Sequence, residues 1–304
     1  MRMPTIRRIR RSLEAPKLVA REINKEAYSL NQGEWYESGI NFFDQDWDNL
    51  LILDACRFDT YNELVDLPGK LTKRYSKASS TREWLESNCD GRVFNDTVYV
   101  TANPQLHHNK DGNEIEFHDV WNVWLQDGWD DDVHTVLPET MAEKGLEAVD
   151  EYPNKRIVIH LLQPHYPFIG DYGQEYFSNN GLRNFYVEVF ERKRNISLSD
   201  VRKAYRENLT CMLPTLERLL TELPGKTVVT SDHGETLGER ARPIPIREFG
   251  HPRGVYMEEL VAIPWQEHTN GSRRKIVCEK SRSSAEKSSE DIVKKRLSHL
   301  GYKS

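Results

Sequence analysis

The sequence predicts an α/β fold, a three-layer sandwich in which helices flank both faces of a mostly parallel central sheet. Apolar, β-branched segments of strand length alternate with segments of helical periodicity, which is the order of elements in a parallel sheet joined by crossover helices. The chain has 304 residues, of which 38% are hydrophobic and 30% charged. This length and composition are typical of a globular protein with one large domain and a heavily charged surface.

The clearest strands are short runs rich in Val, Ile, Leu and Thr, the residues that favour a pleated, buried surface. They are expected over residues 50–55, 97–101, 156–162, 226–230 and 259–265, with further strands over 71–75 and 274–278. Between them, helical periodicity is strongest over 198–223, where Ser199 can cap the first turn and Pro214 is expected to kink the middle.

Three shorter helices complete the pattern. They are expected over residues 81–87, 138–150 and 289–300. Residues 103–132, which hold three tryptophans among many acids, follow neither the helical nor the strand period. We expect this segment to be an insertion over the edge of the sheet.

The charge of the chain excludes one class of partner. The formal net charge is −6, whereas binding to a phosphate backbone needs a dominant cationic face, so no nucleic acid is expected as a partner. No apolar run approaches the roughly 20 residues that a membrane-spanning helix needs.

A cytoplasmic location is expected from the N-terminus and the cysteines. The stretch M-R-M-P-T-I-R-R-I-R-R is basic but lacks the apolar core of a signal peptide. It is expected to be a solvated tail, with peripheral contact to an anionic membrane surface as the alternative. Cys56, Cys89, Cys211 and Cys278 form no C-x-x-C pair and suit free thiols in a reducing compartment.

Polar residues follow three of the predicted strands, where ligands of open α/β sheets bind. Asp54 ends the first strand, His165 follows 156–162, and Asp232 and His233 follow 226–230, with His251 further on in G-H-P-R-G. Each alone is more simply a turn residue or a packed histidine, and a packed role is expected for His160, which lies inside its strand. Their convergence on one sheet edge indicates a divalent cation: Zn²⁺ or Mn²⁺ for a mixed carboxylate and imidazole shell, Mg²⁺ or Ca²⁺ for an oxygen-richer one.

A nucleophile is expected in S-K-A-S-S-T-R-E-W-L, residues 76–85. Its Ser/Thr cluster reads first as a helix N-cap, but the same position exposes a hydroxyl where the helix dipole stabilises an anion. A divalent ion would activate such a hydroxyl for attack on phosphorus or sulfur. The nearby cations Arg57, Lys77 and Arg82 are candidates to hold the non-reacting oxygens of the substrate.

These pieces resemble the alkaline phosphatase superfamily, and its sulfatase branch in particular. The matching stretches are L-I-L-D-A-C-R-F-D (51–59), H-L-L-Q-P-H-Y-P-F (160–168), T-S-D-H-G-E-T-L-G-E (230–239) and G-H-P-R-G-V-Y-M-E-E-L-V-A-I-P-W (250–265). The resemblance implies that Asp54, Asp232 and His233 bind metal together with the nucleophile. It also implies that His165 and His251 contact the oxyanion of the substrate or a second metal.

The sequence departs from sulfatases at the nucleophile. It has no C-x-P-S-R motif, whose cysteine becomes formylglycine, and Asp54 is followed by Ala55 instead of a second aspartate. Thr81, before R-E-W-L, resembles the threonine of the superfamily's lipid-headgroup phosphotransferases, and we prefer it to Ser80 or Ser79. The chain also has no room for the large C-terminal subdomain of sulfatases, so an open pocket is expected.

The resemblance implies a metal-dependent hydrolase of a phosphate or sulfate ester, with attack by Thr81, or by Ser80, and with His165 or His251 protonating the leaving oxygen. One alternative is transfer of the group to a glycan or lipid, and another is a non-catalytic domain that binds a carbohydrate or protein. The expected organisation is a basic N-terminal arm and helix (1–30), a sulfatase-like catalytic domain (31–267), and a polar linker with a C-terminal helix (268–304).

Overall fold

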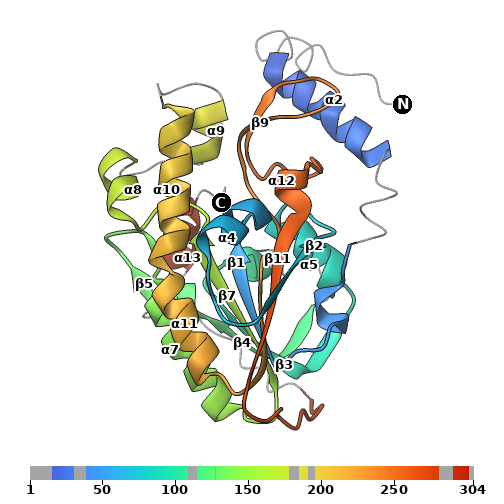
Figure 1. Cartoon of the computed structure of the whole chain (residues 1–304), viewed down its shortest axis with the longest axis vertical. Helices are drawn as coiled ribbons and strands as arrows, with labels where there is room; N and C mark the ends of the chain where they lie inside the picture. Colours follow the sequence, from blue (N-terminus) through green and yellow to red (C-terminus); the bar gives the residue numbers. More distant parts are fainter. Residues whose placement is uncertain are drawn as a thin grey trace.

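A seven-stranded sheet forms the centre of the molecule (Figure 1). The computed structural model describes residues 16–30, 39–108, 115–126, 128–177, 185–190, 196–280 and 290–300, so the basic stretch before residue 16 lies outside the described residues. The strands are β1 (Asn49–Asp54), β2 (Lys70–Tyr75), β3 (Val93–Thr101), β4 (Glu116–Asn122), β7 (Arg156–Pro164), β8 (Gly225–Thr230) and β11 (Ala262–Asn270). Their order is β2-β11-β8-β1-β7-β3-β4, and β11 alone runs antiparallel to its neighbours in this sheet. The predicted mostly parallel sheet is confirmed.

Helices cover both faces of this sheet, so the predicted three layers are present. The helices are α2 (Pro16–Leu30), α4 (Phe58–Leu64), α5 (Thr81–Cys89), α6 (Gln105–His108), α7 (Pro138–Glu151), α8 (Asp171–Tyr176), α9 (Phe185–Phe190), α10 (Leu198–Cys211), α11 (Leu213–Glu222), α12 (Glu258–Val261) and α13 (Glu290–His299), with 3₁₀ turns η1 (Phe42–Asp44) and η2 (Val123–Leu125). One face packs on α4, α7, α10, α11 and α13, and the other on η1 and α5.

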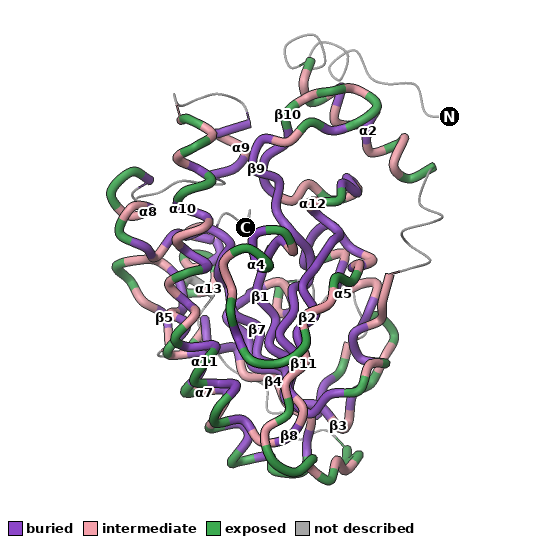
Figure 2. Tube along the Cα trace, viewed as in Figure 1, coloured by how far each residue is buried: buried purple, intermediate pink, exposed green. Residues whose placement is uncertain are grey.

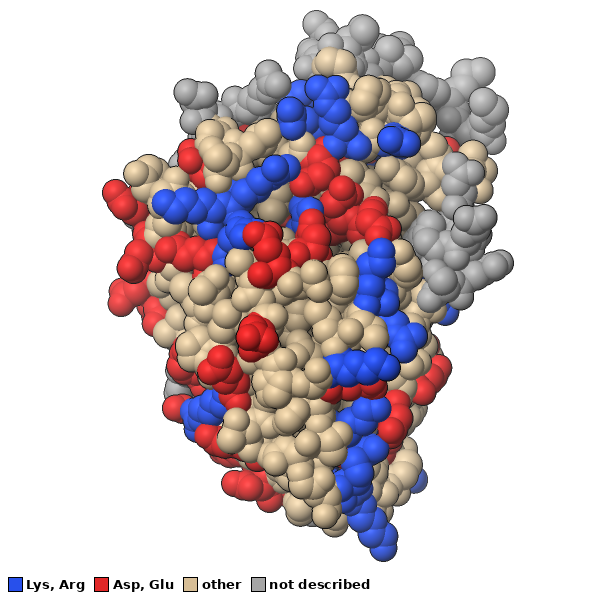
Figure 3. Space-filling view, viewed as in Figure 1, with Lys and Arg blue, Asp and Glu red and all other residues tan. Residues whose placement is uncertain are grey.

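Alternation along β1 divides its side chains between the two cores. Leu51 and Leu53 belong to the core under α7 and α11, whereas Leu50 and Ile52 belong to the core under α5. All six residues of β1 are buried, which explains why the strand reads as a continuous apolar run, and Figure 2 shows the buried centre of the sheet. The exposed Lys70, Lys73 and Arg74 of edge strand β2 discourage pairing with another sheet, and cations line that side of the molecule in Figure 3.

Two small two-stranded sheets accompany the central sheet. β9 (Thr236–Arg240) pairs with β10 (Arg247–Gly250), and β5 (Trp129–Asp130) pairs with β6 (Thr135–Val136). The β9–β10 pair lies beside α2 and α9 at the upper end of the view in Figure 1. Within the described ranges, no helix combines the length and the apolar composition that crossing a bilayer requires.

Several boundaries differ from the sequence prediction. Residues 103–132 do not simply form an insertion, because they contain β4, which pairs in parallel with β3 as the edge strand. The predicted strand over 274–278 is wrong: the segment forms no ladder and is tied down by single backbone bonds, such as Val277 N–H to Asn154 O (2.9 Å). The strand expected over 259–265 begins later, since α12 occupies 258–261.

The long helix expected over 198–223 is two helices. The chain breaks at Met212, and Pro214 lies in the first turn of α11, where its missing N–H costs nothing. Ser197, not Ser199, caps α10, since its Oγ accepts from Asp200 N (3.2 Å).

Trp84 fixes α5, the helix that begins at Thr81, onto the sheet. Its ring is fully buried and meets Phe42 edge to face with centroids 5.3 Å apart. We expect Trp84→Ala to lower the free energy of unfolding by about 3–5 kcal/mol, because it leaves a large cavity. Urea unfolding measures this free energy. Trp84→Phe should lower it less than Trp84→Ala does, and Arg82→Ala, at an exposed position, should stay within about 0.5 kcal/mol of wild type. An equal loss in all three variants would contradict this role.

Candidate active site

The carboxyl ends of three adjacent parallel strands meet at one edge of the sheet, as predicted. β1 lies between β7 and β8, so Asp54 at the end of β1 comes close to His165 after β7 and to Asp232 and His233 after β8. Asp54, Asp232 and His233 are all buried, and one ligand atom of each lies within 4.8 Å of the others. The strand ends therefore converge in space, while the ligand roles remain a proposal.

Thr81 joins this group from α5. Its Oγ1 lies 3.2 Å from His233 Nε2, which in turn lies 3.3 Å from Asp232 Oδ2 and 3.7 Å from Asp54 Oδ1. Four side chains from three separate segments thus surround one small volume.

The hydrogen bonds of His233 leave Nε2 with a lone pair directed into that volume. Nδ1 lies 2.8 Å from the carbonyl oxygen of Gly234, so Nδ1 carries the proton and donates it. Burial, followed by the positive charge of His251, lowers the pKa of His233 well below its ordinary value. The ring is therefore neutral, and Nε2 accepts from Thr81 or ligates a cation.

The two carboxylates each keep one oxygen without a partner. Asp54 Oδ2 accepts from Asn103 Nδ2 (2.6 Å), and Asp232 Oδ1 accepts from the backbone N–H groups of Ala55 (3.1 Å) and His233 (2.9 Å). Across the described residues, neither Asp54 Oδ1 nor Asp232 Oδ2 has a hydrogen-bond donor. Burial, and then the neighbouring Asp232 carboxylate, raises the pKa of Asp54 well above its usual range.

These unpartnered atoms fit a divalent cation. A tetrahedral ion with bonds of about 2.0–2.1 Å to nitrogen and oxygen holds its ligand atoms about 3.3 Å apart. The separations from His233 Nε2, at 3.2, 3.3 and 3.7 Å, match that spacing. Two carboxylates with an imidazole suit Zn²⁺ or Mn²⁺ better than Mg²⁺ or Ca²⁺.

The geometry distinguishes the three hydroxyls of the Ser/Thr cluster. Ser79 Oγ donates to Glu83 Oε2 (2.9 Å) and accepts from Gly254 N (3.0 Å), so it is held in structural bonds. Ser80 occupies the N-cap of α5 but makes no capping bond, and its buried Oγ has no partner in the described structure. Of the three, only Thr81 lies within hydrogen-bond distance of His233 in the described structure, which favours it as the nucleophile.

A second group, His165, Glu235 and His251, lies beside the first. The His251 ring lies 4.6 Å from that of His233 and 4.9 Å from that of His165, centroid to centroid. Glu235 is buried, and its carboxylate lies 3.3 Å from His251 Nδ1. Removal from water alone would lower the pKa of His251, but the negative charge of Glu235 outweighs this and raises it.

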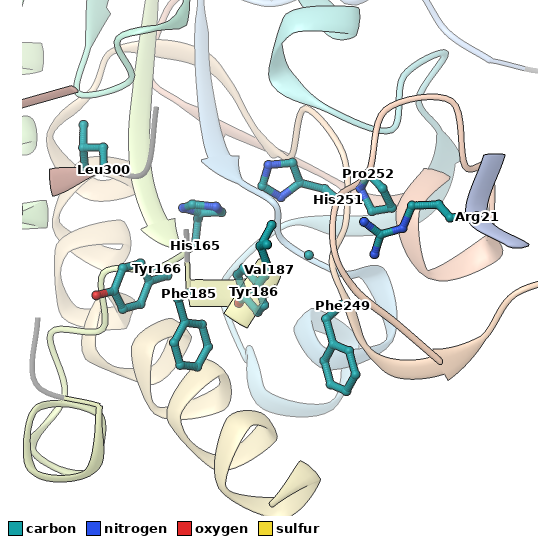
Figure 4. Close-up of a pocket in the computed structure, with 11 residues that line it drawn as sticks. Arg21, His165, Tyr166, Phe185, Tyr186, Val187, Phe249, His251, Pro252 and Leu300 are labelled. Atoms are coloured by element: carbon teal, nitrogen blue, oxygen red, sulfur yellow. The ribbon is translucent and has the colours of Figure 1, made fainter. Parts of the chain in front are cut away.

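A pocket of about 200 Å³ opens next to these histidines. Figure 4 shows His165 and His251 next to each other, with Tyr166, Phe185 and Phe249 among the lining residues. Arg21 reaches its rim from α2 and forms a salt bridge with the buried Glu248. The pocket therefore adjoins the second group at His165 and His251.

The predicted anion-binding cations lie in different surroundings. Arg57 is held by Asp59 and Glu239 (2.5 and 2.8 Å), contacts that favour a structural role. Arg82 is half exposed and pairs with Glu86 (3.1 Å), and Lys77 is half-buried in the turn before α5. Their role as substrate ligands remains a prediction.

Sequence reasoning assigned no role to Glu235 and Asn103, and treated His160 as packed. Glu235 stands inside the quoted S-D-H-G-E string, so its buried contact with His251 could have been suspected from that motif. Asn103 lies in a segment of irregular pattern, and no local signal links it to Asp54.

Comparison with known proteins finds similar solved structures. No family model matches the chain, and no curated protein matches it. The solved structures include the soluble domain of lipooligosaccharide phosphoethanolamine transferase A from Neisseria meningitidis (11% identity, TM-score 0.44, 72% of this chain and 75% of that one). They also include the zinc complex of the periplasmic domain of EptC from Escherichia coli (13% identity, TM-score 0.41, 75% of this chain and 75% of that one). A third is a putative sulfatase from Bacteroides fragilis (17% identity, TM-score 0.25, 47% of this chain and 32% of that one).

The neighbours named here are two phosphoethanolamine transferases and a putative sulfatase, each less than 20% identical to this chain. Against the integral membrane form of the Neisseria transferase, this chain spans 53% of the length. The function is therefore argued from the residues of this site.

The Arg57 cluster predicts an acid-dependent loss of stability. Burial alone would raise the pKa of Asp59 and Glu239, but the hydrogen bonds and charge of Arg57 outweigh it and lower both. The carboxylates of Asp59 and Glu239 bind protons more readily in the unfolded chain than in the folded protein. Their contribution to stability is therefore complete above about pH 5, and it is lost as the pH falls through about 4 toward their pKa values in the folded protein.

We expect Glu239→Gln to reduce the fall in unfolding free energy between pH 6 and pH 3 by about 1 kcal/mol. Urea unfolding across this range measures the difference. The matched control is Glu222→Gln, which removes an exposed partner of Arg218 (2.9 Å) and should leave the profile unchanged. A Glu239→Gln profile identical to wild type would show that Arg57 does not hold this carboxyl.

Proposed function

We propose that the protein is a metal-dependent phosphotransferase that passes a phosphate-ester group from a donor through Thr81 to a glycan or lipid acceptor. The observation that carries the proposal is the position of Thr81 Oγ1, 3.2 Å from His233 Nε2 and in the same buried group as Asp54 and Asp232. Asp54, Asp232, His233 and Thr81 would hold the ion. A bound divalent ion supplies positive charge that favours the deprotonated threonine and offsets the negative charge of the transferring group.

In the first step, Thr81 Oγ1, its proton lost to solvent, attacks the phosphorus of the donor. The bond between phosphorus and the leaving oxygen breaks, and His251 gives a proton to that oxygen. The product is a phosphorylated Thr81 and a free alcohol. His165, whose ring centroid is 4.9 Å from that of His251, would contact a non-reacting oxygen of the phosphorus group.

In the second step, the acceptor hydroxyl attacks the phosphorus of the Thr81 ester. His251, now neutral, takes the proton of the acceptor, and the bond between phosphorus and Thr81 breaks. Thr81 regains its proton from solvent, so both steps together move one group and leave the enzyme unchanged.

The nucleophile favours phosphorus over sulfur and transfer over hydrolysis. The chain lacks C-x-P-S-R, so no formylglycine is expected, and Thr81 before R-E-W-L resembles the threonine of lipid-headgroup phosphotransferases. The hydrolase that the motifs first implied becomes the case in which water is the acceptor.

A non-catalytic binding domain is disfavoured by the site itself. Two buried carboxylates beside an imidazole cost folding free energy unless a cation or proton neutralises them, and a binding module has no need of them. We also keep, as proposals, the three-part division at residues 30 and 267 and a cytoplasmic location, which the four free cysteines support.

Thr81→Ala should lower kcat by at least about 10³ on a chromogenic phosphate diester with added Zn²⁺ or Mn²⁺, because it removes the attacking oxygen. Thr81→Ser should keep measurable activity, and Ser80→Ala, the matched control, should stay within about 3-fold of wild type. Intact-protein mass spectrometry should find the phosphorus adduct in wild type and in Ser80→Ala, but not in Thr81→Ala. Activity that survives in Thr81→Ala would overturn the proposal. Product analysis with sugar, glycerol or water as acceptor separates transfer from hydrolysis.

Glu235→Gln should lower kcat by about 10–100-fold with little change in KM. The amide keeps the size of the side chain but removes the charge that supports a protonated His251, so protonation of the leaving oxygen is slowed. A donor with a nitrophenol leaving group, which needs no proton, should lose much less activity than one with an alkyl alcohol. An equal loss on both donors would contradict the role of His251 as the acid.

A further inference from the structure

His160 is the one other histidine that faces the carboxylates of the site within the described chain. It lies in the middle of β7, is 1% exposed, and its Nε2 lies 3.9 Å from Asp232 Oδ2. Neither of these two atoms has a hydrogen-bond partner among the described residues. Two unpaired buried polar atoms thus face each other across a gap slightly too long for a direct bond.

Tyr99 fixes the orientation of this imidazole. Its hydroxyl lies 2.6 Å from His160 Nδ1, and both side chains are buried on the adjacent strands β3 and β7. The ring also meets the edge of Trp84 with centroids 6.0 Å apart. The imidazole is therefore held by the hydrogen bond to Tyr99 and by the ring of Trp84.

The bond to Tyr99 decides what Nε2 presents to Asp232. If the tyrosine donates to Nδ1, the ring carries its proton on Nε2 and directs an N–H toward the carboxylate. The reverse arrangement would direct a lone pair of Nε2 at the lone pairs of Oδ2, which is repulsive. The electrostatics therefore favour the chain Tyr99 O–H to His160 Nδ1, with His160 Nε2–H toward Asp232 Oδ2.

We propose that His160, oriented by Tyr99, is a positioning residue that holds Asp232 in the geometry needed to bind the cation. Oδ1 of Asp232 is already fixed by two backbone N–H groups, so only Oδ2 remains to be oriented. If the gap between His160 Nε2 and Asp232 Oδ2 shortens by about 1 Å, the two atoms come within hydrogen-bond distance. A lone pair of Oδ2 then remains for the ion. Partners of this kind strengthen metal binding by holding ligating carboxylates in place.

The inference rests on the proposed metal site, so the test measures metal binding and not activity. The metal-free full chain is titrated with Zn²⁺ in competition with a chromogenic chelator. His160→Ala should weaken Zn²⁺ binding about 10–100-fold, and Tyr99→Phe should weaken it about 3–10-fold. His160→Gln, whose amide N–H replaces the donor, should recover most of the affinity. His118→Ala, the matched control, removes another buried histidine of the same sheet and should bind like wild type.

The outcomes distinguish a failure of the proposed metal site from a failure of the positioning role of His160. Failure of wild type to bind Zn²⁺ or Mn²⁺, or unchanged binding in Asp232→Asn, overturns the metal site and this proposal together. Normal binding by wild type with equal affinity in His160→Ala overturns the positioning role alone. Loss in His160→Gln as large as in His160→Ala, with an altered visible spectrum of the Co²⁺-loaded protein, shows direct ligation and also overturns it. Should His160→Ala not fold, His160→Gln and Tyr99→Phe decide.

Discussion

The structure depends on two buried carboxylates, Asp54 and Asp232, placed at the ends of neighbouring strands. An unpaired carboxylate inside a protein costs several kcal/mol, and two side by side also repel each other. The chain meets part of this cost with Asn103 and two backbone N–H groups, but one oxygen of each acid is left over. A cation bound between these two oxygens would neutralise the pair. Protonation of one acid, which the raised pKa of Asp54 favours, is the other way to reduce the cost.

Three distant segments must be locked together for this pair to exist. Ser76 Oγ donates to Asp232 O (2.5 Å) just before α5, and Ser231 Oγ accepts from Cys56 N (2.8 Å) just after β1. The turn after His233 packs against the backbone near Glu259, with Gly234 N donating to Leu260 O (2.7 Å), and a Cβ at Gly234 would collide with that backbone. The glycine of the S-D-H-G string is thus required by close backbone approach. These same bonds bring Thr81 next to His233 and the two carboxylates.

The sequence predicts the scaffold and the centre of the site because both follow from local rules. Buried strands of a parallel sheet read as apolar runs, and their carboxyl ends share one edge, so Asp54, Asp232 and His233 could be placed together without a structure. The edge strand β4 escaped prediction because half-buried edges carry a weak period. Partners such as Asn103 and Glu235 could not be deduced, since their contacts depend on loop paths. The ion pairs of Arg57 with Asp59 and Glu239 could not be deduced either, and its role as a substrate ligand stays a prediction.

The four histidines around the site are differentiated by what surrounds them. Burial is the leading cause that lowers the pKa of His160, His165 and His233, so these rings are neutral and can orient, contact or ligate. His251 differs because its side chain is 24% exposed and lies against the Glu235 carboxylate, which raises its pKa. A proton carrier must reach both substrate and solvent, and it must be stable in its charged form. Of these four rings only His251 meets both conditions, so the proposed division between a metal-binding and a proton-carrying histidine would follow from the position of one buried glutamate.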